Sequence, residues 1–123
     1  KKLNVGHTIG HAIEGYFLDK NPIHHGYCVA WGLLVESRLA VTDKLLAVEE
    51  FDEIKHVITS CYPKPELYEN DIESLLNLLL NDKKNDSNEI NFNLINGFGN
   101  VTINHTFSKQ AIKNALKLEL CQN

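Results

Sequence analysis

Residues 6–17 read GHTIGHAIEGYF, and residues 25–42 read HGYCVAWGLLVESRLAVT. The first stretch has apolar residues at three- and four-residue spacing, which predicts a helix from Gly6 to about Phe17 with Asn4 as a cap near its start. The second is apolar on most sides over its first half, which predicts a helix at the centre of the core. The turn signal Asp19–Pro22 separates them, so an antiparallel helix pair is expected.

Two more helices are expected in the middle of the chain. One spans roughly Ala47 to Ser60, and prolines mark the loop that follows it. Asp71 is a good N-cap for the next helix, which is expected from Ile72 to about Leu80.

The pattern then changes to alternation. Apolar and polar residues alternate over residues 90–94, the period of a half-buried strand, and again from Val101 to Ile103. This predicts a hairpin whose loop is longer than two residues. Ser108 then caps a last helix that runs to about Leu120. The expected fold is therefore mainly α, a helical domain with one small β-hairpin.

Composition narrows the class of protein. A length of 123 residues suits one domain, and we expect residues 1–123 to form a single unit. The net charge of −4 and the scattered basic residues do not favour nucleic-acid binding. No long apolar run predicts a membrane span, and no signal peptide is visible. The three cysteines, Cys28, Cys61 and Cys121, are far apart, so free thiols in the cytoplasm are expected.

The chain opens on Lys-Lys-Leu-Asn without a methionine, and its densest motif starts almost at once. We therefore expect a piece of a larger protein, in which any site is incomplete.

Histidines concentrate near the start of the chain. His7 and His11 lie four residues apart on the first expected helix and so share one face. His24 and His25 begin the next helix, and an antiparallel pair would bring His25 back beside the first. Neutral imidazole is a common ligand for zinc and related metals, so His7 and His25 form a candidate ligand pair.

Structural roles for these histidines are an alternative, because a histidine pair at this spacing also arises by chance. The zincin motif is excluded, since Thr8 stands where its general-base glutamate belongs. Glycines at 6, 10, 15, 26 and 32 suggest close helix packing or close approach of a ligand. A catalytic zinc site normally has three protein ligands. Glu14 and Glu36 are candidates for the third, although a carboxylate from outside the chain is favoured.

Three blocks of sequence resemble the 3-dehydroquinate synthase family. They are Leu3–Glu14 (LNVGHTIGHAIE), His25–Gly32 (HGYCVAWG) and Asp82–Asn85 (DKKN). The first block is long and specific, whereas the third alone would be weak. The resemblance covers essentially the whole chain, as the C-terminal, mostly helical domain of that family.

The resemblance implies an activity and its cofactors. Members of the family are lyases of the shikimate pathway, in aromatic amino acid biosynthesis, and convert 3-deoxy-arabino-heptulosonate 7-phosphate to 3-dehydroquinate. They use NAD and a divalent metal, zinc or cobalt, held by one Glu and two His. It further implies an NAD-binding domain that is absent from this chain, a third ligand outside the chain, and a full-length homodimer. The fragment alone is expected to be inactive.

Residue roles follow from the motif match. His7 and His25 take the two metal-ligand positions, and His11 takes the place of the family's proton-transfer histidine. Asn4 matches a substrate-contacting asparagine. One of Lys83 and Lys84 matches a lysine that holds the phosphate or nearby oxygens of the sugar-phosphate substrate.

One position departs from the family pattern. Tyr27 stands where the family has a glutamate after His-Gly, a carboxylate that could orient His25. Other sugar-phosphate cyclases and metal-dependent polyol dehydrogenases of the same architecture remain alternatives, as does a non-catalytic helical interaction module.

Overall fold

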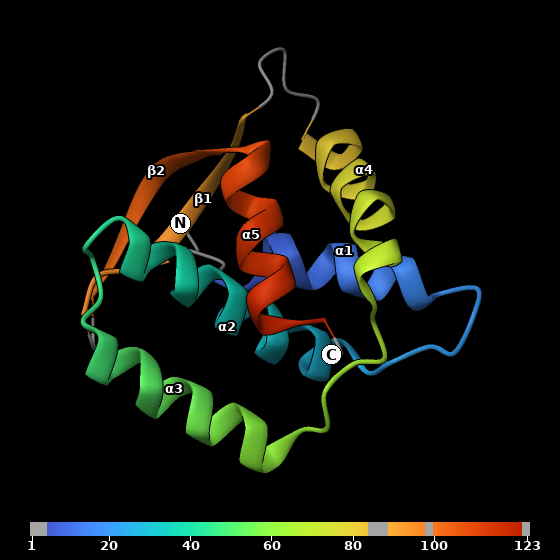
Figure 1. The fold of residues 1–123 in the computed structure, drawn as a ribbon, viewed down its shortest axis with the longest axis horizontal. Helices are drawn as coiled ribbons and strands as arrows, with labels where there is room; N and C mark the ends of the chain where they lie inside the picture. Colours follow the sequence, from blue (N-terminus) through green and yellow to red (C-terminus); the bar gives the residue numbers. More distant parts are fainter. Residues whose placement is uncertain (1–4, 84–88, 98–99, 122–123) are drawn as a thin grey trace.

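The computed structural model describes residues 5–83, 89–97 and 100–121. Figure 1 shows helices gathered around a central helix, with a two-stranded hairpin at one side. The elements are, in order, α1 (His7–Phe17), α2 (His25–Thr42), α3 (Val48–Cys61), the 3₁₀ helix η1 (Glu69–Asp71), α4 (Ile72–Lys83), β1 (Glu89–Ile95), β2 (Val101–Ser108) and α5 (Lys109–Glu119). The expected fold class, mainly α with one small hairpin, is confirmed.

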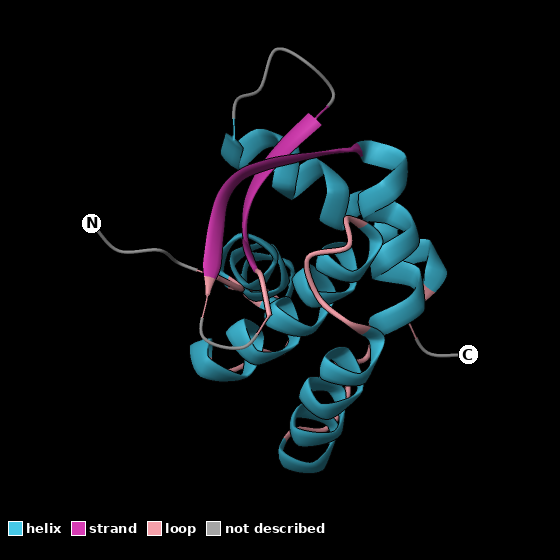
Figure 2. Cartoon of the chain, turned by 90° about the vertical axis from the view of Figure 1, so that its left-hand side faces the viewer, coloured by secondary structure: helices cyan, strands magenta, loops and turns pink. Residues whose placement is uncertain are grey.

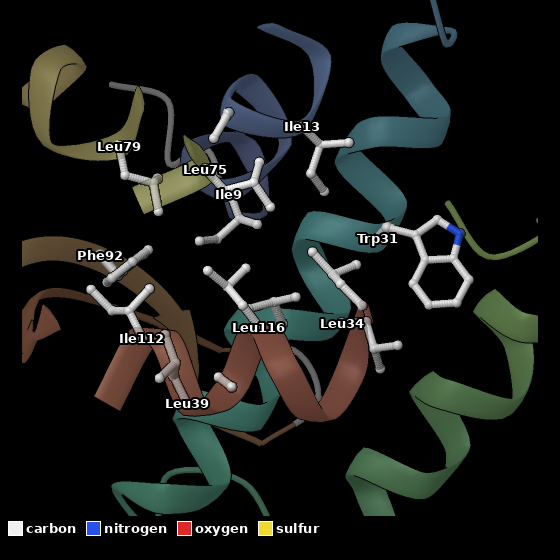
Figure 3. Packing of buried hydrophobic residues seen from close by; sticks show 14 of the residues in the cluster. Ile9, Ile13, Trp31, Leu34, Leu39, Leu75, Leu79, Phe92, Ile112 and Leu116 are labelled. Carbon is white, nitrogen blue, oxygen red and sulfur yellow. The ribbon is translucent and has the colours of Figure 1, made fainter. Parts of the chain in front are cut away.

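Helix α2 is the centre of the core, as its apolar sequence predicts. It packs against α1, α3, α5 and β1, and its buried side chains point in several directions. In Figure 3, Trp31 points toward α3, whereas Leu34 and Leu39 lie on the side of α5. Ile9 and Ile13 of α1 close the core from the other side, and all five side chains are at most 2% exposed.

The hairpin covers one end of this core. Strands β1 and β2 are antiparallel, with Phe92 opposite His105 and a bulge between Phe92 and Leu94. Ile90, Phe92 and Leu94 are buried while Asn91 is exposed, which confirms the predicted half-buried strand. The loop spans residues 96–100 and is longer than two residues, as expected. Figure 2 shows the two strands curving along the outside of the helices.

Three helix ends differ from expectation. Gly6, in the left-handed conformation, occupies the N-cap position of α1 that was assigned to Asn4. Asp71 ends the 3₁₀ turn, where its carboxylate accepts hydrogen bonds from the Tyr68 backbone N–H (2.8 Å) and the Tyr16 hydroxyl, instead of standing as the N-cap of α4. Helix α4 continues to Lys83, past the point where its apolar periodicity fades. The predicted Ser108 cap is confirmed, because its hydroxyl accepts from the Ala111 N–H at 3.2 Å.

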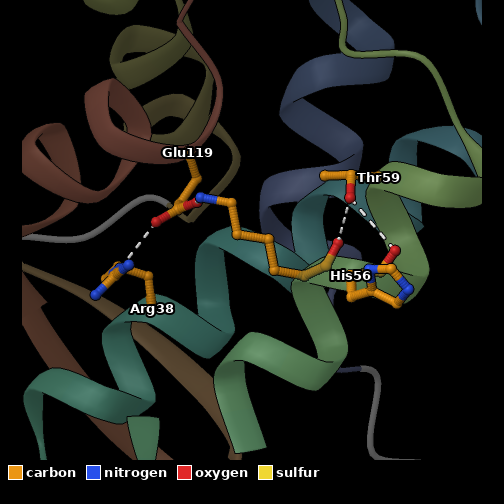
Figure 4. Close-up of polar contacts among 5 residues, drawn as sticks. Arg38, His56, Thr59 and Glu119 are labelled. Carbon is orange, nitrogen blue, oxygen red and sulfur yellow. Dashed lines mark hydrogen bonds and ion pairs between the residues drawn. The ribbon is translucent and has the colours of Figure 1, made fainter. Parts of the chain in front are cut away.

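A buried glutamate joins three helices. The Glu119 carboxylate of α5 is 1% exposed and accepts a hydrogen bond from Arg38 Nε of α2 at 2.8 Å (Figure 4). Lys55 Nζ of α3 lies 3.1 Å from the other carboxylate oxygen. The Arg38 guanidinium also lies 4.2 Å from the centroid of the Phe51 ring. We call Arg38, Lys55 and Glu119 the ionic group.

None of the helices within residues 5–83 and 100–121 combines the length and the apolar character needed to cross a membrane.

The three cysteines are free thiols, and burial raises the pKa of Cys28 to about 11.

Candidate metal and substrate site

Three histidine side chains meet where α1 and α2 lie side by side. His7 and His11 project from one face of α1, and His25 is the first residue of α2. Their ring centroids are 5.7 Å apart for His7 and His11, 5.5 Å for His7 and His25, and 5.9 Å for His11 and His25. The expected return of His25 beside the first helix is what the structure shows. We call these three residues the histidine cluster.

Three glycines allow the two helices to approach this closely. A Cβ atom on Gly32 would lie 2.3 Å from the Gly6 carbonyl oxygen and 2.6 Å from the Gly10 nitrogen. A Cβ on Gly10 would lie 3.1 Å from the Val29 Cα. A Cβ on Gly26, in contrast, would meet no described atom within 4 Å. Close helix packing therefore accounts for Gly6, Gly10 and Gly32, and it does not account for Gly26.

A carboxylate from α2 holds the first turn of α1. Glu36 is 1% exposed, and its two oxygens accept hydrogen bonds from the backbone N–H groups of Gly6 (2.7 Å) and Ile9 (3.2 Å). The first N–H groups of a helix lack intrahelical partners, and the helix dipole favours a negative charge beside them. Glu36 thus positions the turn that bears His7, and its carboxylate is used for that purpose.

Each candidate metal ligand has an acceptor beside its Nδ1 atom. His7 Nδ1 lies 3.4 Å from the Val5 carbonyl oxygen. His25 Nδ1 lies 3.1 Å from Glu14 Oε1, and Glu14 lies seven residues, about two turns, after His7 on α1. When Nδ1–H donates to such an acceptor, Nε2 carries the lone pair that can bind a metal. The partners therefore favour the tautomer that a ligand histidine needs on both residues.

The cluster lies on an accessible face. The His25 side chain is 51% exposed and that of Glu14 is 37% exposed, while His11 is exposed and His7 half-buried. Among the residues that the structure describes, no group of three or more His, Cys, Asp or Glu side chains is arranged to hold a metal ion. The described part of the chain thus offers a histidine pair that fits part of a ligand set.

Tyr27 faces away from the histidine cluster. Its hydroxyl donates a hydrogen bond to the Pro63 carbonyl oxygen, and its ring packs edge-on against Tyr62 at 5.6 Å. Burial is the main reason that the pKa of Tyr27 is raised. Position 27 therefore contacts the segment after α3, and the side chain beside His25 is Glu14.

His24, like Tyr27, lies outside the histidine cluster although it is adjacent to His25 in sequence. It lines an open pocket of about 550 Å³ between the segment after α1 and the segment after α3, together with Lys20, Tyr27 and Lys64. None of the three residues of the histidine cluster lines this pocket.

The candidate substrate residues lie largely outside the described residues. Asn4 and Lys84 belong to ranges that the structure does not describe. Lys83 is the last residue of α4, and its side chain is likewise outside the description. The structure therefore brings together His7, His11 and His25 only.

Two contributors to the site were missed from the sequence. The sequence predicts Glu14 only as a candidate metal ligand, although its spacing of seven residues from His7 places both on one face of α1. The contact of Glu36 with the first turn of α1 spans some thirty residues of sequence. The periodicity of neighbouring residues cannot predict a contact between segments so far apart in sequence.

Comparison with known proteins agrees with this geometry. Residues 1–85 match the family described as 3-dehydroquinate synthase C-terminal. A 3-dehydroquinate synthase from Parabacteroides distasonis is 39% identical over 94% of the chain and 33% of its own length. Those from Picrophilus torridus and Staphylococcus aureus are 36% and 34% identical over 90% and 85% of the chain. The chain spans about a third of the length of these relatives.

A solved structure shares the fold. The structure of 2-deoxy-scyllo-inosose synthase complexed with carbaglucose-6-phosphate, NAD⁺ and Co²⁺ aligns with a TM-score of 0.78 at 24% identity, over 95% of this chain and 33% of that one. The chain thus has the fold of about a third of that synthase. More narrowly, the chain belongs to the family of 3-dehydroquinate synthase C-terminal domains, and the resemblance inferred from its motifs is confirmed.

Proposed function

We propose that this chain is the metal- and substrate-binding domain of a 3-dehydroquinate synthase. The whole protein would convert 3-deoxy-arabino-heptulosonate 7-phosphate to 3-dehydroquinate and phosphate, a lyase reaction of the shikimate pathway. The observation that carries the proposal is the convergence of His7, His11 and His25 on one accessible face of a domain of this family. The three relatives reported above, at 34–39% identity, are each named 3-dehydroquinate synthase.

His7 and His25 are the proposed metal ligands of this chain. Their rings are neighbours, and each has its Nδ1 atom beside an acceptor, which leaves Nε2 for coordination. Zinc sites of catalytic type have three protein ligands and one open position. The third ligand would be a carboxylate outside this chain, since Glu36 is engaged by α1 backbone groups and Glu14 lies on His25 Nδ1.

The remaining residues are assigned to substrate. His11 is exposed and its ring lies 5.9 Å from the His25 ring, so the His11 imidazole can take a proton from, or return one to, a substrate beside the metal. Asn4, with Lys83 or Lys84, is proposed to hold the sugar phosphate, where a lysine suits the charge of the departing phosphate.

Two groups from outside the chain complete the chemistry. A bound Zn²⁺ or Co²⁺ would supply Lewis acidity toward a substrate hydroxyl and its ketone, and NAD would supply a reversible hydride acceptor. The structural neighbour, complexed with NAD⁺ and Co²⁺, supports both assignments. We place NAD mainly on a separate NAD-binding domain, which fits the one-third coverage of the relatives.

Further parts of the proposal concern the whole protein. We place it in the cytoplasm as a homodimer that binds neither nucleic acid nor membrane. The free thiols support the cytoplasmic location, and the net charge of −4 with scattered basic residues supports the absence of nucleic-acid binding. The homodimer is what the resemblance to the family implies.

A chimaera tests the proposed function. Residues 1–123 would replace the matching third of the Parabacteroides distasonis relative, and phosphate release from 3-deoxy-arabino-heptulosonate 7-phosphate would be measured. We expect turnover with NAD and zinc, and loss of bound zinc in the His7→Ala and His25→Ala variants.

The same chimaera separates the alternatives. Turnover of glucose 6-phosphate, of which the neighbour's bound carbaglucose-6-phosphate is a carbocyclic analogue, without turnover of the heptulosonate would favour another cyclase. A folded chimaera that binds no zinc and turns over neither substrate would favour the non-catalytic helical module. Thermal unfolding of each variant checks that a loss of zinc is not a loss of fold.

A further inference from the structure

We propose that Glu14 is the positioning residue of His25, holding its imidazole in the Nδ1–H tautomer. The inference rests on the proposed function, because it assigns the second partner of a proposed metal ligand. The observation is the 3.1 Å contact between Glu14 Oε1 and His25 Nδ1, which joins α1 to the first residue of α2. No role for Glu14 follows from the reaction itself.

The geometry leaves one nitrogen of His25 for the cluster. Nδ1 faces the Glu14 carboxylate, while the ring stands 5.5 Å from His7 and 5.9 Å from His11. A carboxylate accepts hydrogen bonds and cannot donate one when ionised, so Nδ1 must carry the proton and Nε2 the lone pair. A histidine with a carboxylate behind it is a more basic ligand, and its ring orientation is fixed.

The contact between Glu14 and His25 explains how His25 can be oriented although Tyr27 replaces the family's glutamate. The family has a glutamate there, and a carboxylate at that position would face the segment after α3, where Tyr27 contacts Pro63 and Tyr62. The carboxylate that reaches the His25 ring comes from α1 instead. We infer that Tyr27 leaves the orientation of His25 intact, because Glu14 sets it.

Glu14 also couples the two helices at the site. His7, His11 and Glu14 project from the same face of α1, so the helix that supplies one proposed ligand orients the other. The glycine contact at Gly10 and Gly32 sets the helix separation that makes a 3.1 Å contact possible. Both side chains of the pair remain partly exposed, at 51% and 37%, so water weakens the contact.

Long-range ¹H–¹⁵N spectra of the histidine rings in the chain of residues 1–123 test the inference directly. The spectra are recorded near pH 8, above the ordinary histidine pKa of about 6.5, where ring nitrogen shifts report which atom carries the proton. We expect the Nδ1–H form to dominate at His25, and Glu14→Ala to shift His25 toward the Nε2–H form that free imidazole side chains favour. Glu14→Gln keeps an acceptor oxygen, and we expect it to retain much of the original tautomer.

Glu53→Ala is the matched control, since Glu53 is an exposed glutamate on α3, away from the cluster. It should leave the His25 tautomer unchanged. A His25 ring that is Nε2–H in the parent chain, or that does not respond to Glu14→Ala, would overturn the inference. Thermal unfolding confirms that each variant is folded.

A second measurement separates this inference from the proposed function. Zn²⁺ affinity of the chimaera should fall about tenfold in Glu14→Ala, the lower end of the range for such supporting partners because this pair is partly exposed. Unchanged affinity would overturn the inference while the metal assignment stands. A tautomer response in a folded chimaera that binds no Zn²⁺ would overturn the proposed metal site instead.

Discussion

The histidine cluster and the ionic group both place polar side chains between helices, yet they differ in burial and in how far their polar groups are paired within the protein. In the ionic group the Glu119 carboxylate is 1% exposed and lies between two cations, so its charge is matched inside the protein. In the histidine cluster three imidazoles stand together, and the carboxylate that contacts one of them, Glu14 on His25 Nδ1, is itself 37% exposed, while His25 is 51% exposed. The ionic group is thus buried and paired, whereas the histidine cluster is accessible to solvent.

This difference separates structural polar groups from functional ones. Removing one partner from a buried pair leaves an uncompensated charge, which is why such groups stabilise a fold when intact. An exposed histidine cluster adds little to stability, because its members can be solvated in the unfolded chain just as well. Substitutions in the ionic group should therefore lower stability and leave metal binding unchanged. Substitutions of the proposed ligands in the histidine cluster should abolish metal binding and leave stability unchanged.

The close contact of Gly32 with Gly6 and Gly10 should have the largest effect on stability, since α2 carries residues of both the histidine cluster and the ionic group. In Gly32→Ala the added Cβ would lie 2.3 Å from the Gly6 carbonyl oxygen, so α1 and α2 must separate. We expect a loss of about 3 kcal/mol in the free energy of unfolding, measured by urea denaturation. Gly26→Ala is the control, because its Cβ meets no described atom within 4 Å. Equal effects of the two substitutions would contradict the role of Gly32.

Glu119→Ala should lower the stability of the fold without affecting metal binding. It leaves Arg38 and Lys55 without their shared carboxylate, and we expect a loss of about 2 kcal/mol, reduced from the value for a fully buried pair because both cations reach water. Zinc content of the chimaera should not change. Glu73→Ala removes an exposed ion pair with Lys113 and serves as the matched control. A similar loss in both variants would show that burial does not decide the effect.

Tyr16→Phe tests the face of α1 opposite the histidines. The Tyr16 hydroxyl donates to Asp71, and this hydrogen bond, with burial, raises the pKa of Tyr16 to about 12. We expect Tyr16→Phe to lose about 1 kcal/mol at pH 7. Because the folded pKa lies above the usual 10, the stabilisation is complete below pH 10 and disappears as the pH rises toward 12. Stability curves of the two proteins that stay parallel over that interval would contradict this origin.

His11→Ala should have the smallest effect on stability, within about 0.5 kcal/mol, because its side chain is exposed. Its effect on activity should be large, a loss of about a hundredfold in turnover of the chimaera, with zinc content unchanged. His7→Ala is the comparison, since it should lose zinc. Loss of zinc in His11→Ala would make His11 a ligand and not a proton-transfer residue.

Much of this architecture could be predicted from the sequence, for reasons that particular elements make clear. The apolar spacing of α1 and the nearly uniform apolar character of α2 predict both helices, and the turn before Ile23 predicts their antiparallel pairing. The spacing of His7 and His11 then predicts the cluster. The sequence predicts the end of α4 near Leu80, three residues too early, because residues 81–83 are polar and carry no apolar period.

The supporting contacts could not be predicted in the same way. Glu36 lies on the buried core helix, and its sequence neighbours give no sign that it reaches the first turn of another helix. Glu14 is part of a predicted pattern, but its partner His25 is on a different element. Both contacts depend on how closely α1 and α2 approach, and that distance is set by glycines whose role becomes specific only in three dimensions.

The Glu36 carboxylate keeps the first turn of α1 ordered before a metal ion binds. Helix ends usually fray, yet opening the first turn of α1 would strand a buried carboxylate that now accepts from Gly6 and Ile9. The turn that carries His7 therefore opens only together with α2, and we expect the amide hydrogens of Gly6 and Ile9 to exchange with deuterium as slowly as those of the core. The entropy of ordering the backbone that carries His7 is then lost during folding and not at the moment of metal binding.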